Sequence, residues 1–313
     1  MATPTLSTVR TVVPIPNVIH IRGSNAPAPV YHALFSLSDA DFVIRSLQGT
    51  LYRIHSYTLR ITSGFFESMF SLPQPKNSLI SDVLDVYEDD FPLELLLKMI
   101  IGLPIPRWKS LCDLARVLAL AEKWDTPGPL SIMRNALTAP QFLHDHPLSC
   151  YSLATHFDWK EEAKIASTHT LTLNLSDPSY SLILGEMSSK DVLPLLDLHQ
   201  KRRNMFRELL DSPERFAAGN SSAYHCNRCG VTELDNSMWR AFKRAMFLEM
   251  ERRPLGDTLG VMEGSTPDWP EALACWEAKC AKDDCRALNY DRIATLRQIR
   301  ACVSLLPSTI DIQ

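Results

Sequence analysis

The sequence predicts an α+β protein, with a short three-stranded sheet and packed helices near the N-terminus and only helices after it. Three short segments rich in β-branched and aromatic residues lie between residues 39 and 86. From Phe91 onward, apolar residues recur every three or four positions, which is the spacing of an amphipathic helix. The 11 glycines against 21 prolines favour helices with proline at their junctions over glycine-rich phosphate-binding loops.

Length and charge limit the classes of function. At about 150 residues per domain, 313 residues allow roughly two domains. The 32 basic and 36 acidic residues give a net charge of −4, which argues against a phosphate-binding surface spread over the whole protein. The common nucleotide-binding, zinc-protease and hydrolase motifs are absent. We therefore expect no enzymatic activity, no catalytic residue and no small-molecule substrate.

Cellular location is predicted from the cysteines and the hydropathy pattern. Six of the eight cysteines follow residue 225, and the chain is long for a disulfide-stabilised secreted domain. The first residues show no signal-peptide pattern, and no apolar run of 18 residues occurs. We expect an intracellular protein, cytoplasmic and/or nuclear, with reduced thiols and no membrane partner.

The first elements are a tail and a hairpin. Residues 1–30 contain five prolines and no acidic residue, which predicts a flexible N-terminal tail. Asp41–Ser46 and Leu51–His55 are predicted strands separated by a turn at Gln48 and Gly49, and Val83–Val86 is a third strand.

The helix between the second and third strands carries an apolar stripe. Thr62 and Ser63 cap it, and Leu72 and Pro73 end it. Four apolar residues share one face, and this pattern favours the core over an exposed anchor for a partner helix. They are Phe65, Phe66, Met69 and Phe70.

The same periodicity predicts the later helices. They cover residues 91–101, 108–124, 129–137, 147–157, 159–173, 192–210, 236–252 and 271–280, followed by a last helix with Ile293, Leu296, Ile299 and Val303 apolar. We interpret the basic run at 201–203 as a solvated helix face rather than a localisation signal.

Residues 39–138 resemble a BTB/POZ domain. The residues that carry the resemblance are Asp41, the hairpin that ends in Ile54-His55, the Ser63-x-Phe65-Phe66-x2-Met69-Phe70 helix, and the late helix that ends in Ala121-Glu-Lys-Trp124. The stretch is most similar to BTB proteins of filamentous and mushroom-forming fungi, in which Leu-Pro-Gln-Pro also follows Phe70. The resemblance covers about a third of the chain.

This resemblance implies a function and a division of the chain. BTB domains form homodimers, and many recruit a cullin-type ubiquitin ligase scaffold. Asp41 and His55 would line a polar spot near the dimer surface, and the Phe65–Phe70 helix would lie partly at the dimer interface. We expect a flexible tail at 1–30, a BTB/POZ-like domain at 31–140, a helical extension at 141–215 and a helical cysteine-bearing region at 216–313.

The late cysteines are the strongest chemical signal. Cys226 and Cys229 form a C-x2-C knuckle followed by glycine, and two thiolates at that spacing can chelate one Zn²⁺. Cys280 and Cys285 form a second pair 50 residues later. We predict a structural zinc knuckle held by these four cysteines. Fungal BTB proteins of this kind look similar here, with a tryptophan soon after the first pair, as at Trp239.

Other assignments of these cysteines stay open. They can be buried free thiols, or His225 or Cys275 can substitute as a ligand. Catalytic zinc is not expected, because four thiolates leave no open coordination position. The remaining cysteines, Cys112, Cys150 and Cys302, are predicted core positions.

Two functions follow from these expectations. The favoured one is a protein–protein interaction module that homodimerises and acts as a substrate adaptor for a cullin-type ligase. The alternative is a transcriptional or chromatin regulator that contacts nucleic acid through the cysteine-bearing region. Residues 201–253 carry 11 basic and 7 acidic residues, a modest excess, and no Cys2His2 finger is present, so nucleic acid is the less favoured partner.

Overall fold

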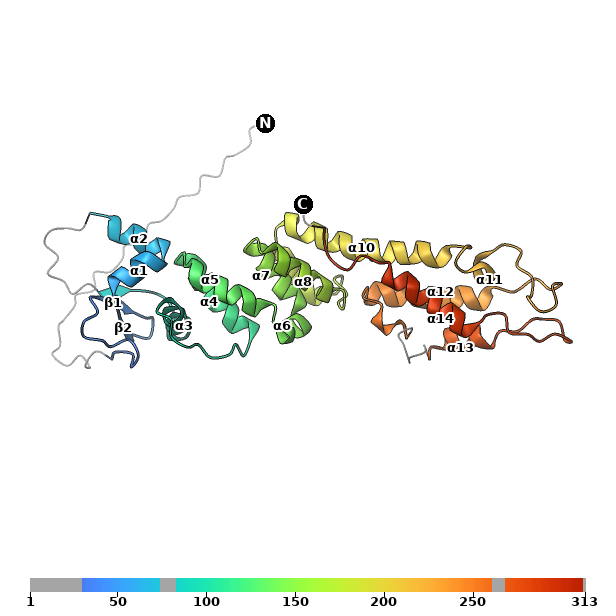
Figure 1. Ribbon diagram of the computed structural model, residues 1–313, viewed down its shortest axis with the longest axis horizontal. Coiled ribbons are helices and arrows are strands. Elements are labelled where there is room, and N and C mark those ends of the chain that lie inside the picture. The colour runs from blue at the N-terminus through green and yellow to red at the C-terminus, as the bar shows by residue number, and fades with distance from the viewer. Residues whose placement is uncertain (1–29, 74–82, 261–267, 312–313) are drawn as a thin grey trace, which may run out of the picture. The chain divides into compact units, whose positions relative to one another are not determined.

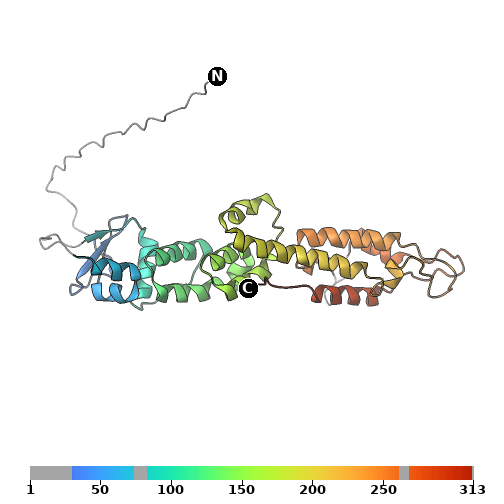
Figure 2. The same ribbon diagram turned by 90° about the horizontal axis from the view of Figure 1, so that it is seen from above.

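The computed structural model describes residues 30–73, 83–260 and 268–311, so the tail predicted at 1–30 lies almost entirely outside it. The chain divides into two compact units, Met1–Ser56 with Asn77–Asp90, and Tyr57–Lys76 with Phe91–Gln313. The first contains the three-stranded sheet and the second is helical (Figures 1 and 2). The predicted α+β class is confirmed.

The sheet has the order β2-β1-β3. β1 (Phe42–Arg45) pairs antiparallel with β2 (Leu51–Ile54) and parallel with β3 (Val83–Asp85). In β1 the buried Phe42 and Ile44 alternate with more exposed residues, as the two-residue period of a strand requires. The N–H of Gly49 donates to Ser46 O at 3.0 Å and closes the predicted hairpin turn.

The helical unit begins with five helices. They are α1 (Ser56–Thr62), α2 (Gly64–Ser71), α3 (Asp90–Ile100), α4 (Leu111–Lys123) and α5 (Pro127–Leu137). Ser63 caps α2 as predicted, because its Oγ accepts the N–H of Phe66. The same hydroxyl donates to Trp124 O, and the N–H of Gly64 donates to Asp125 O, so the start of α2 is fixed against the end of α4.

Five further segments follow. They are α6 (Pro140–Asp145), α7 (Pro147–His156), α8 (Lys160–Thr170), the 3-10 turn η1 (Pro178–Tyr180) and α9 (Ser181–Glu186). Proline stands at the first position of α5, α6 and α7, where its missing N–H costs no helical hydrogen bond. α7 and α8 pack together, as the predicted helix pair requires.

The last elements surround one hydrophobic core. They are α10 (Ser189–Asp211), α11 (Ala217–Asn220), α12 (Ser237–Arg252), the turn η2 (Asp257–Leu259), α13 (Pro270–Glu277) and α14 (Arg292–Ser304), and Figure 1 shows α12 and α14 beside α10. The predicted α12 stripe is buried: Trp239, Phe242, Met246 and Met250.

The prediction that the second cysteine pair lies at a helix end is wrong. α13 ends at Glu277, and Cys280 lies beyond it in a hairpin rather than at the helix end. Ile293 is exposed in the first turn of α14, whereas Leu296 and Ile299 on the same helix are buried.

The prediction of a solvated helix face for the basic run at 201–203 is wrong for Arg202. This side chain is buried and its guanidinium donates to four backbone carbonyls at 2.6–3.4 Å, those of Pro254, Leu255, Leu306 and Pro307. These carbonyls follow the C-terminal ends of α12 and α14, where the helix dipole favours a cation. The contacts compensate for burial, although desolvation lowers the pKa of Arg202 to about 10.

Candidate metal centre

The first cysteine pair lies in a short hairpin between α11 and α12. The N–H of Cys226 donates to Thr232 O at 2.8 Å, which closes the hairpin. Inside it, the N–H of Gly230 donates to Cys226 O at 2.8 Å, and Gly230 has a φ of +66°. Glycine adopts this left-handed conformation without steric cost, so it allows the tight turn directly after Cys229.

The second pair lies in a similar hairpin between α13 and α14. The N–H of Cys280 donates to Ala287 O at 2.8 Å, and the N–H of Cys285 donates to Lys282 O at 2.9 Å. Arg286, directly after Cys285, has a φ of +46°. In both hairpins a left-handed residue therefore follows the second cysteine.

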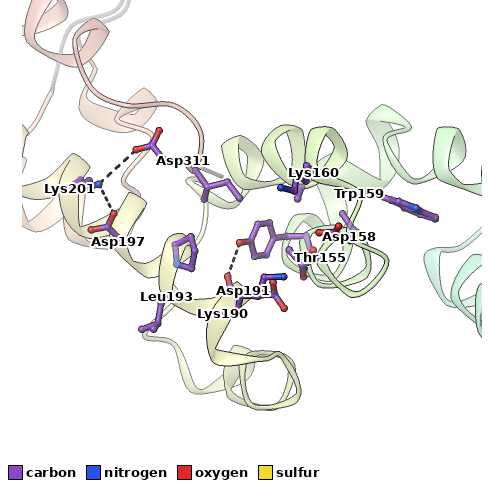
Figure 3. A pocket seen from close by; sticks show the side chains of 15 residues that line it. Thr155, Asp158, Trp159, Lys160, Lys190, Asp191, Leu193, Asp197, Lys201 and Asp311 are labelled. Carbon is purple, nitrogen blue, oxygen red and sulfur yellow. Dashed lines mark hydrogen bonds and ion pairs between the residues drawn. The ribbon is translucent and has the colours of Figure 1, made fainter. Parts of the chain in front are cut away.

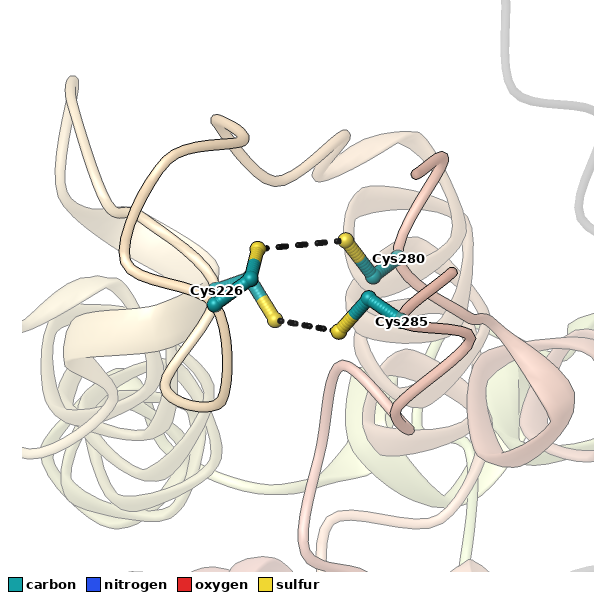
Figure 4. A group of neighbouring side chains, drawn as sticks. Cys226, Cys280 and Cys285 are labelled. Atoms are coloured by element: carbon teal, nitrogen blue, oxygen red, sulfur yellow. Dashed lines mark hydrogen bonds between the residues drawn. The ribbon is translucent and has the colours of Figure 1, made fainter. Parts of the chain in front are cut away.

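The two hairpins bring four sulfur atoms together. Cys226 Sγ lies 3.7 Å from Cys285 Sγ, and Cys229 Sγ lies 3.9 Å from Cys280 Sγ (Figure 4). All four sulfurs lie within 4.8 Å of one another, and none belongs to a disulfide. Each close contact joins one hairpin to the other, so a shared ion would hold both hairpins.

Backbone N–H groups favour thiolates in the first hairpin. Those of Cys229 and Arg228 point at the Cys226 sulfur and lower its pKa. Those of Val231 and Thr232 lower the pKa of Cys229 to about 6. The thiolate is the form that binds metal, so this hairpin is prepared for a cation.

The pKa of Cys285, in the second hairpin, is raised instead of lowered. The N–H of Ala287 favours its thiolate, but burial and the three neighbouring cysteines outweigh that hydrogen bond and raise its pKa to about 11. Four sulfurs this close cannot all carry negative charge without a cation between them. A bound dication would displace the remaining protons, which is the usual coupling of metal binding to thiol ionisation.

Contacts around the sulfurs hold the hairpins in place. The side chain of Arg228 donates to Cys285 O at 3.4 Å, from one hairpin to the other. Leu234 packs with Cys226, Cys280 and Cys285 in a small cluster separate from the main core. Cys226 and Cys280 are buried, which restricts the access of water to the sulfurs.

The structure does not bring the substitute ligands to this cluster. Within residues 30–73, 83–260 and 268–311, only the four cysteines form a group able to hold a metal ion. His225 is exposed and outside the group. Cys275 is buried in the core of α10, α12, α13 and α14, where desolvation raises the pKa of its thiol to about 12.

Of the three cysteines predicted in the core, one is not there. Cys150 and Cys302 are buried, whereas Cys112 is exposed on α4. Its neighbours Leu111 and Leu114 occupy the buried face of that helix, and position 112 faces away from them.

Asp41 and His55 have separate partners. The carboxylate of Asp41 accepts the hydroxyl and the N–H of Ser56, the latter at 2.7 Å, and these bonds lower the pKa of Asp41. His55 Nε2 lies 3.7 Å from the Asp39 carboxylate. Both Asp41 and His55 are exposed, and Asp41 fixes the residue at which α1 begins.

The predicted apolar stripe on α2 is only partly core. Phe66 is fully buried and its ring packs edge-on against Trp124, with centroids 5.1 Å apart. Met69 and Phe70 are half-buried, and Phe65 is 43% exposed. Of these four residues, predicted for the core or the dimer interface, Phe66 alone is fully buried.

A cavity of about 710 Å³ lies among α7, α8, the start of α10 and the segment after α14. Three of its charged groups interact with one another, because Lys201 Nζ lies 2.7 Å from Asp197 and 3.9 Å from Asp311 (Figure 3). The hydroxyl of Tyr151 donates to Asp191 O at 2.7 Å. These interactions do not indicate a particular class of ligand for the cavity.

Comparisons with known proteins add no assignment. No family model and no curated protein matches the sequence. Among the helices of the described residues, none is both long and apolar enough to span a membrane.

Proposed function

We propose that this chain is a non-enzymatic protein–protein interaction module whose C-terminal helices are held by a structural Zn²⁺. The observation that carries the zinc assignment is the meeting of Cys226, Cys229, Cys280 and Cys285. The interaction role rests on the BTB/POZ-like sequence pattern and on an exposed apolar surface described below.

The sulfur geometry fits zinc. A tetrahedral ion with Zn–S bonds of about 2.3 Å requires sulfur atoms about 3.8 Å apart. The two close sulfur pairs, at 3.7 and 3.9 Å, lie on either side of that value. Soft thiolate ligands in a tetrahedral arrangement select zinc over magnesium or calcium, which prefer oxygen.

A closed set of four thiolates supports a structural role for the ion. Catalytic zinc sites keep one position open for water or substrate, and four cysteines fill every tetrahedral position. Bound here, the ion would join the segment before α12 to the segment before α14. It would thereby tie together two segments that lead into helices of one hydrophobic core.

Self-association is the second part of the proposal. Tyr57 and Ile61 are 62% and 61% exposed, and their four-residue spacing places them on one face of α1. Phe65 follows at the start of α2 and is also exposed. Large apolar side chains grouped on a surface are typical of protein interfaces. We assign this α1–α2 surface (Tyr57, Ile61 and Phe65) to a second copy of the chain, the partner that the BTB/POZ resemblance implies.

The adaptor role rests on the resemblance alone. A homodimer of this kind would present a substrate to a cullin-type ubiquitin ligase scaffold through its BTB-like part. Co-purification of a cullin with the tagged full chain from its native cells would support it. Recovery of the chain with other partners and without any cullin would restrict the proposal to the interaction module.

Nucleic-acid binding gains no support from the charges. Arg202 is buried against backbone carbonyls, and Arg253 lies 2.6 Å from the Asp257 carboxylate. Lys201, Arg207, Lys243 and Arg252 also form ion pairs with carboxylates. Six of the 11 basic residues in 201–253 are therefore engaged within the chain rather than free for phosphates.

Light scattering coupled to size-exclusion chromatography tests self-association at micromolar concentration. We expect twice the mass of the 35.3-kDa chain, and the monomer mass for Ile61→Glu. The matched control is Leu248→Glu, because Leu248 is 57% exposed on α12, away from the α1–α2 surface. A monomeric wild type, or a dimer unaffected by Ile61→Glu, contradicts the assignment.

A further inference from the structure

The four cysteines of the metal centre differ in their access to solvent. Cys226, Cys280 and Cys285 are 3%, 1% and 8% exposed, whereas Cys229 is only half-buried. The hairpin turn that follows Cys229 is open to solvent, since Val231 is 70% exposed. A small molecule in solution therefore reaches Cys229 before the other three cysteines.

Each sulfur of the first hairpin has a sulfur of the second hairpin within reach. Cys229 Sγ lies 3.9 Å from Cys280 Sγ, and Cys226 Sγ lies 3.7 Å from Cys285 Sγ (Figure 4). A disulfide bond requires about 2.05 Å between its sulfurs, so each of these pairs must close by about 1.8 Å. Two disulfides can thus form, each from one hairpin to the other.

Such disulfides would join the same two segments as the ion. Cys226 and Cys285 lie 59 positions apart, and Cys229 and Cys280 lie 51 positions apart. Cross-links that close loops of this length strongly restrict the unfolded chain. The two hairpins would therefore stay together after the ion is lost.

The other four cysteines do not combine access to solvent with a place in the cluster. Cys150, Cys275 and Cys302 are buried. Cys112 is exposed on α4 but lies outside the four-sulfur group. Redox-sensitive cysteines are typically accessible and placed next to a second thiol, and Cys229 is the residue that meets both conditions.

We propose that the cluster is a site of reversible oxidation by hydroperoxides, which replaces the bound ion by the disulfides Cys229–Cys280 and Cys226–Cys285. The site rests on the proposed zinc centre, because cysteines that bind zinc are thiolates and the thiolate is the nucleophile. Cys229 is the residue attacked first, and Cys280 is its resolving partner.

The first disulfide forms in two steps. The Cys229 thiolate attacks one oxygen of hydrogen peroxide, the O–O bond breaks, and hydroxide leaves while Cys229 becomes a sulfenic acid. The Cys280 thiolate then attacks this sulfur, the S–O bond breaks, and a second hydroxide leaves. One peroxide thus takes two electrons from two thiolates.

The second disulfide follows from the first. Loss of two ligands weakens the hold on the ion and opens Cys226 and Cys285 to a second peroxide, which oxidises them in the same way. Disulfide sulfurs carry no negative charge, so the ion leaves once both bonds have formed. A dithiol reductant reverses each step by exchange, and one dithiol becomes a cyclic disulfide for every protein disulfide that it reduces.

A peroxide titration of the zinc-loaded full chain tests the proposal. The chain carries Cys112→Ser, which removes the exposed thiol outside the cluster. A chromogenic zinc indicator should report about one equivalent of zinc released for every two equivalents of hydrogen peroxide consumed. The number of free thiols in the denatured protein should fall by four, and dithiothreitol with added zinc should restore both values.

Tryptic peptide mapping without reduction identifies the pairs. Trypsin cleaves after Arg228 and after Lys282, which separates the two cysteines of each hairpin onto different peptides. We expect the Cys229 peptide linked to the Cys280 peptide at low peroxide, and the Cys226 peptide linked to the Cys285 peptide at higher peroxide. Disulfides within either hairpin would overturn the proposal.

Thermal melts test whether the disulfides take over the role of the ion. The oxidised, zinc-free chain should melt at least about 5 °C above the reduced chain from which a chelator has removed the zinc. Equal melting temperatures of these two forms would contradict the replacement of the ion by disulfides.

Zinc content measured before the titration keeps the two proposals separate. Zinc-loaded protein that retains its metal and its thiols in about a tenfold excess of peroxide overturns the oxidation site and leaves the zinc centre standing. Protein that contains no zinc but forms the two expected disulfides contradicts the zinc centre and supports the oxidation site.

Discussion

Acidification should loosen the junction of α8 and α10 through one buried histidine. His199 Nε2 lies 3.2 Å from Thr170 Oγ1, whose own hydrogen is donated to Ser167 O at 2.7 Å. Thr170 Oγ1 is therefore left to accept a hydrogen bond from Nε2 of His199. Burial, together with the charges of Arg203 and Arg202, lowers the pKa of His199 from 6.5 to about 4.

The size and sign of the effect follow from this difference. The unfolded chain binds the proton near pH 6.5 and the folded chain near pH 4. Between these values the unfolded state carries more protons, so the free energy of unfolding falls as pH falls. The full contribution is present above pH 6.5, and about 3 kcal/mol is lost by pH 4, at about 1.4 kcal/mol per pH unit.

Urea unfolding followed by tryptophan fluorescence at pH 7 and pH 4 measures this loss. The matched variant is His199→Gln, whose amide can donate to Thr170 without titrating. We expect wild type to lose about 3 kcal/mol more than the variant between the two pH values. Equal losses in both proteins, or an NMR titration of the His199 ring with a pKa near 6.5, would refute the reasoning.

Three further predictions concern stability and thiol reactivity. Arg202→Met should lower the free energy of unfolding by about 3 kcal/mol, because buried carbonyls lose their donor. Arg203→Met should lower it much less, and urea unfolding measures both changes. Gly219→Ala should lower the free energy of unfolding by about 1–3 kcal/mol, since the added Cβ overlaps the indole ring of Trp239. Gly185→Ala is the control: position 185 has open space around it, so this change should leave the melting temperature unchanged or raise it. Iodoacetamide followed by mass spectrometry should modify the exposed Cys112 before the buried Cys150, Cys275 and Cys302, and earlier modification of these three thiols would contradict the described burial.

Periodic patterns in the sequence were the reliable signals. Apolar residues recur along α12 often enough to define one face of the helix, and all four of them, at positions 239, 242, 246 and 250, are buried. The cysteine pairs were equally informative, because ligand spacing reflects the size of the ion rather than distant packing. The local form of the second pair was less predictable, since α13 ends at Glu277 and leaves Cys280 in a hairpin.

Features set by distant contacts were missed. The short helix α1 was not predicted, and its first residue is held by the carboxylate of Asp41, 15 residues earlier. Cys112 is a single position, and a single position has no period to reveal its face. Asn289 Oδ1, which is buried without a hydrogen bond to any described residue, has no sequence signal at all, because its surroundings depend on the fold.

The burial of Arg202 was also missed, although the sequence contained a signal for it. It lies four residues after Leu198 and four before Phe206, within the buried stripe of α10. The neighbouring basic residues suggested a solvated face, yet the apolar spacing placed this position inside. A charged residue at a stripe position indicates a buried cation with fixed partners, here the carbonyls that follow α12 and α14.

The most direct test of the central claim is the zinc content of the purified full chain, measured by mass spectrometry of the metal. The proposed site predicts about one equivalent of zinc per chain in wild type and in Cys112→Ser, and near none in Cys229→Ser. Less than about half an equivalent in wild type, or an unchanged content in Cys229→Ser, would contradict a zinc centre at Cys226, Cys229, Cys280 and Cys285.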